Sequence, residues 1–183
     1  NLMVSSEHIS VALESFGQSP WFDNISRGLL SSGELTRMVR EEGLKGVTSN
    51  PTIFEKAVST GSDYDSALEA LVASGVREPK AVFEALAVED IRAAADILAP
   101  VHRASGGADG HVSLEVSPTL ARDTEGTVRE ARKLHGAVGR PNVMIKVPAT
   151  AEGVPAVAQL VSEGISVNVT LIFAVSRYEA VME

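Results

Sequence analysis

The sequence predicts an α/β protein in which parallel strands alternate with helices, and a (β/α)8 barrel is the arrangement that fits best. Short apolar runs typical of strands alternate with amphipathic stretches typical of helices. Strands separated by helices pair in parallel through right-handed crossovers. The later strand–helix units recur at roughly 25–30 residues, the spacing of a barrel of about 250 residues over eight units. An open doubly wound sheet is the alternative, but the G-x-G-x-x-G turn that often marks its ligand site is absent from the sequence.

The chain is expected to form a single domain over residues 1–183, because no Gly/Ser-rich linker or long charge run divides it. We expect five strands, at 20–24, 46–50, 111–116, 142–147 and 166–173. We expect helices at 8–16, 32–42, 64–73, 124–134, 151–163 and 176–183, with at least one more within 78–103. Asp123 is suited to cap the N-terminus of the helix at 124–134, and Gly164 is suited to end the helix at 151–163.

The composition excludes several classes of protein. The 183 residues are 44% hydrophobic and 22% charged, which is typical of a globular chain. The net charge of −8 disfavours a general nucleic-acid binder, because such a field repels polyanions. The absence of cysteine excludes disulfides, thiolate nucleophiles and Cys-based metal sites. No apolar run is long enough to span a membrane, and the N-terminus, which lacks Met, shows no secretory signal. A cytoplasmic protein is therefore expected.

The polar residues within the expected strands lie on one face. Successive strand side chains point to opposite faces, so Val143, Ile145 and Val147 share one face and Lys146 takes the other. The helix-facing side of a barrel must be apolar, so the polar side points inward, near the C-terminal strand ends where barrels build active sites. The expected inward set is Asp23, Asn50, Glu115, Lys146, Asn168 and Thr170, and Thr48 shares the face of Asn50.

A structural interpretation competes with a site for these residues. For Lys146 or Glu115 taken alone, a buried ion pair is the simpler explanation. Polar groups from five strands on one face are hard to explain by packing, so the set favours a site. The four histidines show no metal-ligand spacing, so no metal is expected. His111 and Ser113 are expected to fill the barrel.

A lysine in a walled, largely apolar pocket loses hydration, which favours the neutral amine. A neutral amine attacks ketones and aldehydes and forms a Schiff base, which then accepts electrons during C–C cleavage. Carboxylates move the protons, and Asn and Thr bind hydroxyls and water. The pattern therefore indicates class I aldol chemistry on a sugar. Two alternatives stay open: an isomerase in which Lys146 anchors a phosphate or carboxylate, and a polar barrel interior that only binds its ligand.

Several motifs together resemble the transaldolase family, in order along nearly the whole chain. They are WFDNISR (21–27), GVTSNPTIF (46–54), SLEVSP (113–118), VMIKVPATAEG (143–153) and GISVNVTLIF (164–173). The resemblance is greatest to the larger bacterial type, as in actinomycetes. It is weaker to the small fructose-6-phosphate-aldolase-like relatives, because the helices after Pro51 are longer here. Another class I sugar-phosphate aldolase, such as a fructose-6-phosphate aldolase, is the alternative that the resemblance leaves open.

The resemblance implies a role for each inward residue. Lys146 would form the Schiff base with the dihydroxyacetone unit of a ketose phosphate, and Asp23 would take the C4 hydroxyl proton. Glu115 and Thr170 would hold the catalytic water. Asn50 and Asn168 would bind the dihydroxyacetone hydroxyls, with Thr48 supporting that wall. The unit would pass from sedoheptulose 7-phosphate to glyceraldehyde 3-phosphate, giving erythrose 4-phosphate and fructose 6-phosphate in the non-oxidative pentose phosphate pathway.

The resemblance also implies what lies outside this sequence. The family has eight strands, and this sequence ends just after the fifth, so the phosphate-binding Ser and Arg are expected beyond residue 183. No cofactor or metal is needed, and the partners are sugar phosphates rather than nucleic acid or membrane. The complete protein is expected to be a monomer or homodimer. Residues 1–183 alone are expected to be inactive, because five parallel strands cannot close the barrel.

Overall fold

A computed structural model describes residues 9–183 of the chain. The strands are β1 (Trp21–Asp23), β2 (Gly46–Thr48), β3 (His111–Glu115), β4 (Val143–Pro148) and β5 (Val167–Thr170). The helices are α1 (Ile9–Glu14), α2 (Arg27–Ser31), α3 (Glu34–Glu41), α4 (Pro51–Ser59), α5 (Asp65–Ala73), α6 (Pro79–Ala104), α7 (Thr124–Val138), α8 (Gly153–Ser162) and α9 (Val175–Met182). A 3-10 turn, η1 (Pro118–Leu120), follows β3.

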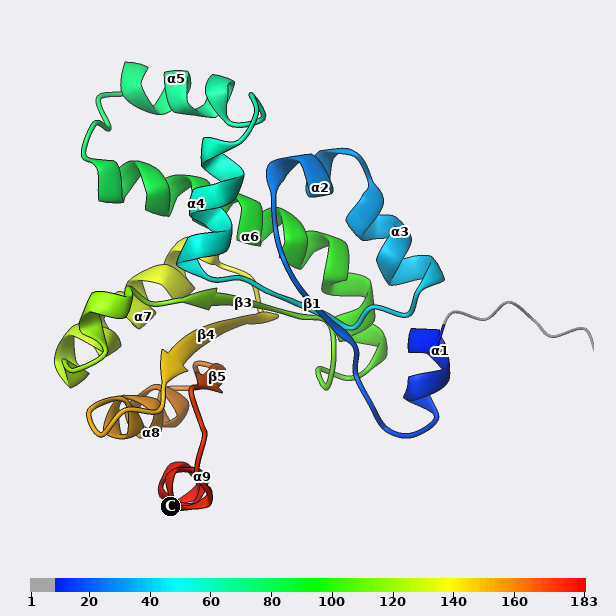
Figure 1. Ribbon diagram of the computed structural model, residues 1–183, viewed down its shortest axis with the longest axis vertical. Helices are drawn as coiled ribbons and strands as arrows, with labels where there is room; N and C mark the ends of the chain where they lie inside the picture. Colours follow the sequence, from blue (N-terminus) through cyan, green and yellow to red (C-terminus); the bar gives the residue numbers. More distant parts are fainter. Residues whose placement is uncertain (1–8) are drawn as a thin grey trace, which may run out of the picture.

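The five strands form one parallel sheet in the order β1-β2-β3-β4-β5. Every strand therefore pairs with its neighbour in the sequence, as in a (β/α)8 barrel. A doubly wound sheet would reverse its strand order at a switch point, and this sheet has none. The sheet is thus the five-stranded part of a barrel, as predicted. Figure 1 shows α6, α7 and α8 arranged around the outside of the strands.

The helix-facing side of the sheet forms the hydrophobic core. Its strand residues are buried and apolar, namely Val47, Val112, Leu114, Val143, Ile145 and Val147. Helix α6 packs on β3, α7 packs on β4, and α8 packs on β4 and β5. Each fully buried aliphatic side chain contributes ~1.5–3 kcal/mol. The apolar face is therefore held against the helices, and the polar face must point the other way.

Local signals explain several helix boundaries. The Asp123 side chain accepts a hydrogen bond from the Gly126 amide at 2.8 Å, so it caps α7 as predicted. Helix α8 begins at Gly153, two residues later than expected, and the Thr150 hydroxyl oxygen accepts a hydrogen bond from the Gly153 amide at 2.9 Å. Gly164, at φ 79°, provides the left-handed turn after α8.

The structure corrects several expected boundaries. Strand β2 ends at Thr48 rather than at residue 50, because Asn50 caps the N-terminus of α4. The expected helix at 32–42 begins at Glu34, because Gly33 adopts φ 80°, and a separate short helix, α2, precedes it. Helix α7 continues to Val138, four residues beyond the expected end, and stops at the left-handed Gly139. Strand β5 ends at Thr170 rather than Phe173, because Leu171 leaves the extended conformation with φ 62°.

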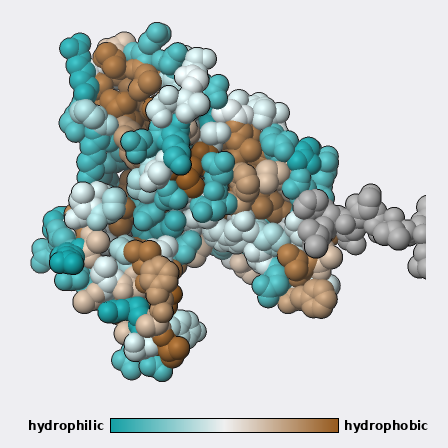
Figure 2. All heavy atoms as spheres, in the orientation of Figure 1, coloured by the Kyte–Doolittle hydropathy of each residue, from teal (hydrophilic) through white to brown (hydrophobic). Residues whose placement is uncertain are grey.

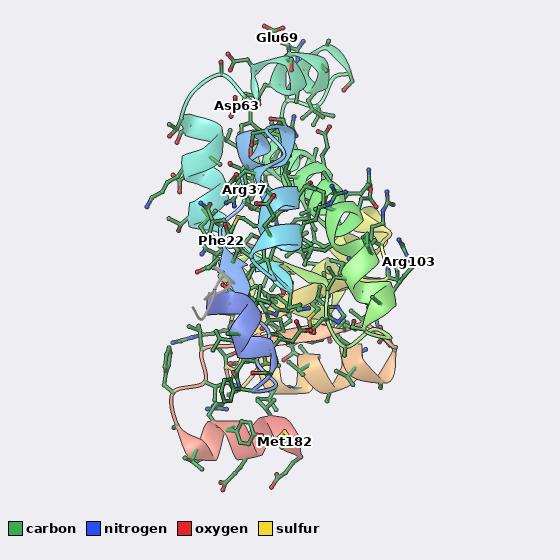
Figure 3. All side chains as sticks on the ribbon, turned by 90° about the vertical axis from the view of Figure 1, so that its right-hand side faces the viewer. Phe22, Arg37, Asp63, Glu69, Arg103 and Met182 are labelled. Carbon is green, nitrogen blue, oxygen red and sulfur yellow. The ribbon has the colours of Figure 1, made fainter. Side chains whose placement is uncertain are left out.

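Apolar side chains are exposed where the described chain ends. The set consists of Leu171, Phe173, Val175, Tyr178 and Met182. Hydrophobic surface lies around α9 in Figure 2, and Met182 lies at the tip of α9 in Figure 3. Phe173 is 89% exposed, which is unusual for so large an apolar side chain. Among residues 9–183, no helix combines the length and the apolar character needed to cross a bilayer.

Candidate active site

Lys146 lies on the inner face of β4, where its ammonium contacts one carbonyl and one carboxylate. The residue is 9% exposed. Its Nζ donates to the Ser49 carbonyl oxygen at 2.9 Å and lies 3.5 Å from Glu115 Oε2. The amine is therefore held by two groups in a largely water-excluded position. The pairing of Lys146 with Glu115 that the sequence suggested is present, and it lies within a larger polar cluster.

The strand register places the other inward residues in the same row as Lys146 or in the rows next to it. Glu115 on β3 is the register partner of Lys146, and Lys146 is the register partner of Asn168 on β5. Asp23, Thr48 and Ser113 form the adjacent row across β1, β2 and β3. Thr170 is one row further along, opposite Pro148. Because parallel strands end at one edge, residues far apart in sequence meet in these rows.

Two serines that the sequence analysis did not assign to the site connect its strands. The buried Ser49 hydroxyl donates to the Ser113 carbonyl oxygen at 2.9 Å. The Ser113 hydroxyl oxygen accepts from Asn168 Nδ2 at 3.0 Å, which fixes the orientation of that amide. Ser113 is thus more than the barrel filling that was expected. The position of Ser113 on the polar face of 111–116 was the available signal. Ser49 acts through its hydroxyl on a backbone carbonyl and through its own carbonyl oxygen, and it left no comparable pattern.

Asn50 combines a structural contact with an amide nitrogen that has no hydrogen-bond partner among residues 9–183. Its Oδ1 accepts from the Ile53 amide at 3.0 Å and caps α4, where Pro51 takes the first helical position. With the oxygen used, the amide nitrogen is the group that remains for a ligand. Nearby, the Thr48 hydroxyl oxygen is buried without a hydrogen-bond partner among the described residues. Buried hydroxyls are nearly always paired, so this one suits a ligand or a water.

Asp23 lies on the same inner face, but no hydrogen bond or ion pair holds its carboxylate within residues 9–183. It borders an open hollow of about 500 Å³ between the loop after β1 and helix α4. The hollow is lined by Asp23, Asn24, Ser26, Ile53, Lys56, Ala57, Thr60 and Asp63. The Thr170 side chain is also half-buried on the inner face. The structure therefore places Asp23 and Thr170 on the expected face without joining either to Lys146.

The chemistry of the cluster follows from its groups. The cluster holds an amine, a carboxylate 3.5 Å away, and an amide nitrogen and a hydroxyl that have no partner among the described residues. These groups can form an imine and bind the hydroxyls of a small polyol. No group of three or more potential ligands among His, Asp and Glu that could hold a metal ion occurs in the described part of the chain.

Comparison with known proteins identifies relatives of this chain. The profile of the family described as Transaldolase/Fructose-6-phosphate aldolase matches residues 20–183. The chain is 54% identical over 171 residues to "Transaldolase" of Thermobifida fusca (strain YX), covering 93% of this chain and 46% of that protein. It is 49% identical over 169 residues to "Transaldolase" of Trichodesmium erythraeum (strain IMS101), covering 91% and 43%. The chain thus spans less than half the length of these curated relatives.

Proposed function

The chain belongs to the transaldolase/fructose-6-phosphate aldolase family, and on that premise we propose that the complete protein is a transaldolase that works through a Schiff base on Lys146. It would move a dihydroxyacetone unit from sedoheptulose 7-phosphate to glyceraldehyde 3-phosphate, with erythrose 4-phosphate and fructose 6-phosphate as products. The observation that carries this proposal is the buried Lys146 amine beside Glu115 on the inner face of the strands.

In the proposed reaction the Lys146 amine adds to the C2 carbonyl of the ketose, and loss of water gives an iminium ion. Glu115, at 3.5 Å, and Thr170 would hold the water that carries protons in this step. The Asp23 carboxylate then takes the proton of the C4 hydroxyl. The C3–C4 bond breaks, its electron pair enters the iminium system to form an enamine, and the aldose phosphate leaves as an aldehyde.

The return half of the reaction uses the same groups. The enamine carbon attacks the carbonyl carbon of the acceptor aldehyde, and Asp23 returns its proton to the new alkoxide. Water then hydrolyses the iminium ion and releases the ketose phosphate and the free Lys146 amine. The Asn50 amide nitrogen, the Asn168 Oδ1 and the unpaired Thr48 hydroxyl are suited to hold the dihydroxyacetone hydroxyls throughout.

Borohydride trapping in the complete protein tests the proposal. Fructose 6-phosphate and borohydride should give a reduced adduct that peptide mapping places on Lys146. Lys146→Met should abolish the adduct, whereas Lys133→Met should not, because Lys133 lies on the outer surface and pairs with Glu84. An adduct that maps to another lysine contradicts the assignment. Turnover without any adduct supports an isomerase. Ligand binding without turnover and without an adduct supports a binding protein.

A further inference from the structure

A buried polar cluster outside the site joins three separate segments of the chain. Arg27 begins α2, Tyr64 directly precedes α5, and Asp90 lies in the middle of α6. The Tyr64 hydroxyl donates to Asp90 Oδ2 at 2.6 Å, and Arg27 Nε and Nη2 donate to Asp90 Oδ1 at 3.0 and 2.9 Å. The Arg27 guanidinium also stacks on the Tyr64 ring, 4.8 Å from its centroid. Both carboxylate oxygens of Asp90 are therefore used.

This cluster, the Arg27–Tyr64–Asp90 clamp, is costly to rearrange. The Asp90 side chain is 2% exposed and that of Arg27 is 19% exposed. Burial raises the pKa of Asp90, while the hydrogen bonds from Tyr64 and Arg27 act against that rise. Burial also raises the pKa of Tyr64, so its hydroxyl stays a donor. Arg27 Nη2 also donates to the exposed Glu89 Oε2 at 2.8 Å. Any rearrangement that separates Asp90 from Tyr64 and Arg27 leaves a buried carboxylate unpaired, which favours the observed geometry.

The clamp fixes the backbone that carries Asp23. The Tyr64 hydroxyl oxygen accepts a hydrogen bond from the Arg27 backbone amide at 3.0 Å, so the clamp holds the main chain as well as the side chain. Only three residues separate Asp23 from Arg27: Asn24, the fully buried Ile25, and Ser26, which caps α2. On its other side Asp23 is held by strand pairing with Thr48. The segment is therefore anchored at both ends.

The Asp23 carboxylate is exposed and has no side-chain partner among residues 9–183, so the backbone sets the position from which it projects, and no neighbouring group compensates for a shift of that backbone. The clamp also fixes one wall of the hollow that Asp23 borders. Asp63, next to Tyr64, lies against α2 (Figure 3), where a Cβ on Gly28 would be 2.6 Å from Asp63 Oδ2. Asp63 and Asp23 line the same hollow. A shift of the clamp would thus move both Asp23 and one wall of the space in front of it.

We propose that Arg27, Tyr64 and Asp90 are positioning residues for C–C bond cleavage, acting by fixing the backbone position from which the Asp23 carboxylate reaches the substrate. The inference rests on the proposed function of Asp23. It separates the two chemical stages: imine formation depends on Lys146 and Glu115, which share no hydrogen bond or ion pair with the clamp among residues 9–183, whereas cleavage depends on Asp23. Misplacing a reacting group by about 1 Å can cost ~10²-fold in rate. A support that acts only on stability would instead affect both stages alike.

Mass spectrometry of borohydride-trapped complete protein separates the stages. Trapping before cleavage leaves a six-carbon phosphate adduct on Lys146, and trapping after cleavage leaves a three-carbon adduct. In Tyr64→Phe, which removes one oxygen atom and keeps the ring, we expect cleavage to slow by ~10-fold or more while imine formation keeps its rate. The ratio of six-carbon to three-carbon adduct should rise. Asp90→Asn should act in the same direction, and Arg27→Lys should retain part of the cleavage rate.

Asp96→Asn is the matched control, because Asp96 lies on the same helix and forms an exposed ion pair with Arg140. Its adduct ratio should equal that of the wild type. An unchanged ratio in Tyr64→Phe, or a parallel loss of both adducts in the clamp variants, would overturn the positioning role and leave the clamp as a structural feature. Failure of the wild-type protein to form any adduct would instead overturn the proposed function itself.

Discussion

Replacing Gly46 with alanine should destabilise the fold, because the single tryptophan of the chain lies where the new methyl group would be. Gly46 on β2 is the register partner of Trp21 on β1. A Cβ at Gly46 would lie 2.3 Å from Trp21 Cε2 and 2.4 Å from Cδ2, where ordinary contact begins at 3.4 Å. The indole or the strand must then move by about 1 Å, and overpacking of this kind costs ~1–3 kcal/mol.

The same displacement reaches the site, because Asp23 lies two residues along β1 from Trp21. We therefore expect Gly46→Ala to slow cleavage by ~10-fold to 10²-fold in addition to lowering stability. Urea unfolding of the complete protein, followed by circular dichroism, measures the free energy of unfolding. The part of the tryptophan emission that Trp21→Phe removes reports separately on whether the indole has left its place over Gly46.

Gly136→Ala is the control for this measurement. Gly136 lies on the exposed side of α7, and no atom lies within 4 Å of a Cβ added there. Its replacement should stabilise the protein by ~0.5–1 kcal/mol, because alanine is the better helix former. If Gly46→Ala were as stable as the wild type, with unchanged Trp21 emission, the packing of the indole against β2 would be refuted.

The remaining predictions concern single residues. Asp23→Ala should leave imine formation intact and accumulate the six-carbon adduct, whereas Glu115→Ala should slow imine formation by ~10²–10⁴-fold; equal effects on both stages would contradict the assigned roles. Because the pKa of Tyr64 is raised in the fold, the contribution of its hydroxyl to the free energy of unfolding should be fully present below pH 10.0 and be lost as the pH rises above that value. The urea midpoint should therefore decline less with rising pH in Tyr64→Phe than in the wild type. Asn142→Ala should cost about 2–4 kcal/mol in urea unfolding, since the amide of Asn142 donates to two buried carbonyl oxygens; a loss below ~1 kcal/mol would argue against both bonds.

Much of the fold was predictable because strands have a short and local period. Alternation of polar and apolar residues around Lys146 requires no knowledge of distant contacts, and the structure places its apolar neighbours in the core. Boundaries were less predictable. The end of β5 depends on the left-handed conformation of Leu171, a residue whose type does not favour that conformation, so nothing in the local sequence indicated it.

The candidate site was predictable to the same extent and for the same reason. The inward direction of Glu115 and Asn168 follows from strand alternation, and the register rows then place both beside Lys146. That the Ser49 carbonyl oxygen binds the amine was not predictable, because a backbone acceptor exists at every position and carries no residue signature.

By itself, the sequence determined the alternation of strands and helices, the polar face that carries Lys146, and the family to which the chain belongs. Only the tertiary structure decided which polar groups meet. Arg27 and Asp90 are 63 residues apart, and Arg27 and Tyr64 are 37 apart, in segments whose local patterns are independent of one another. Their hydrogen bonds form because the packing of α6 against the sheet brings these segments together, and such long-range contacts leave no periodic trace in the chain.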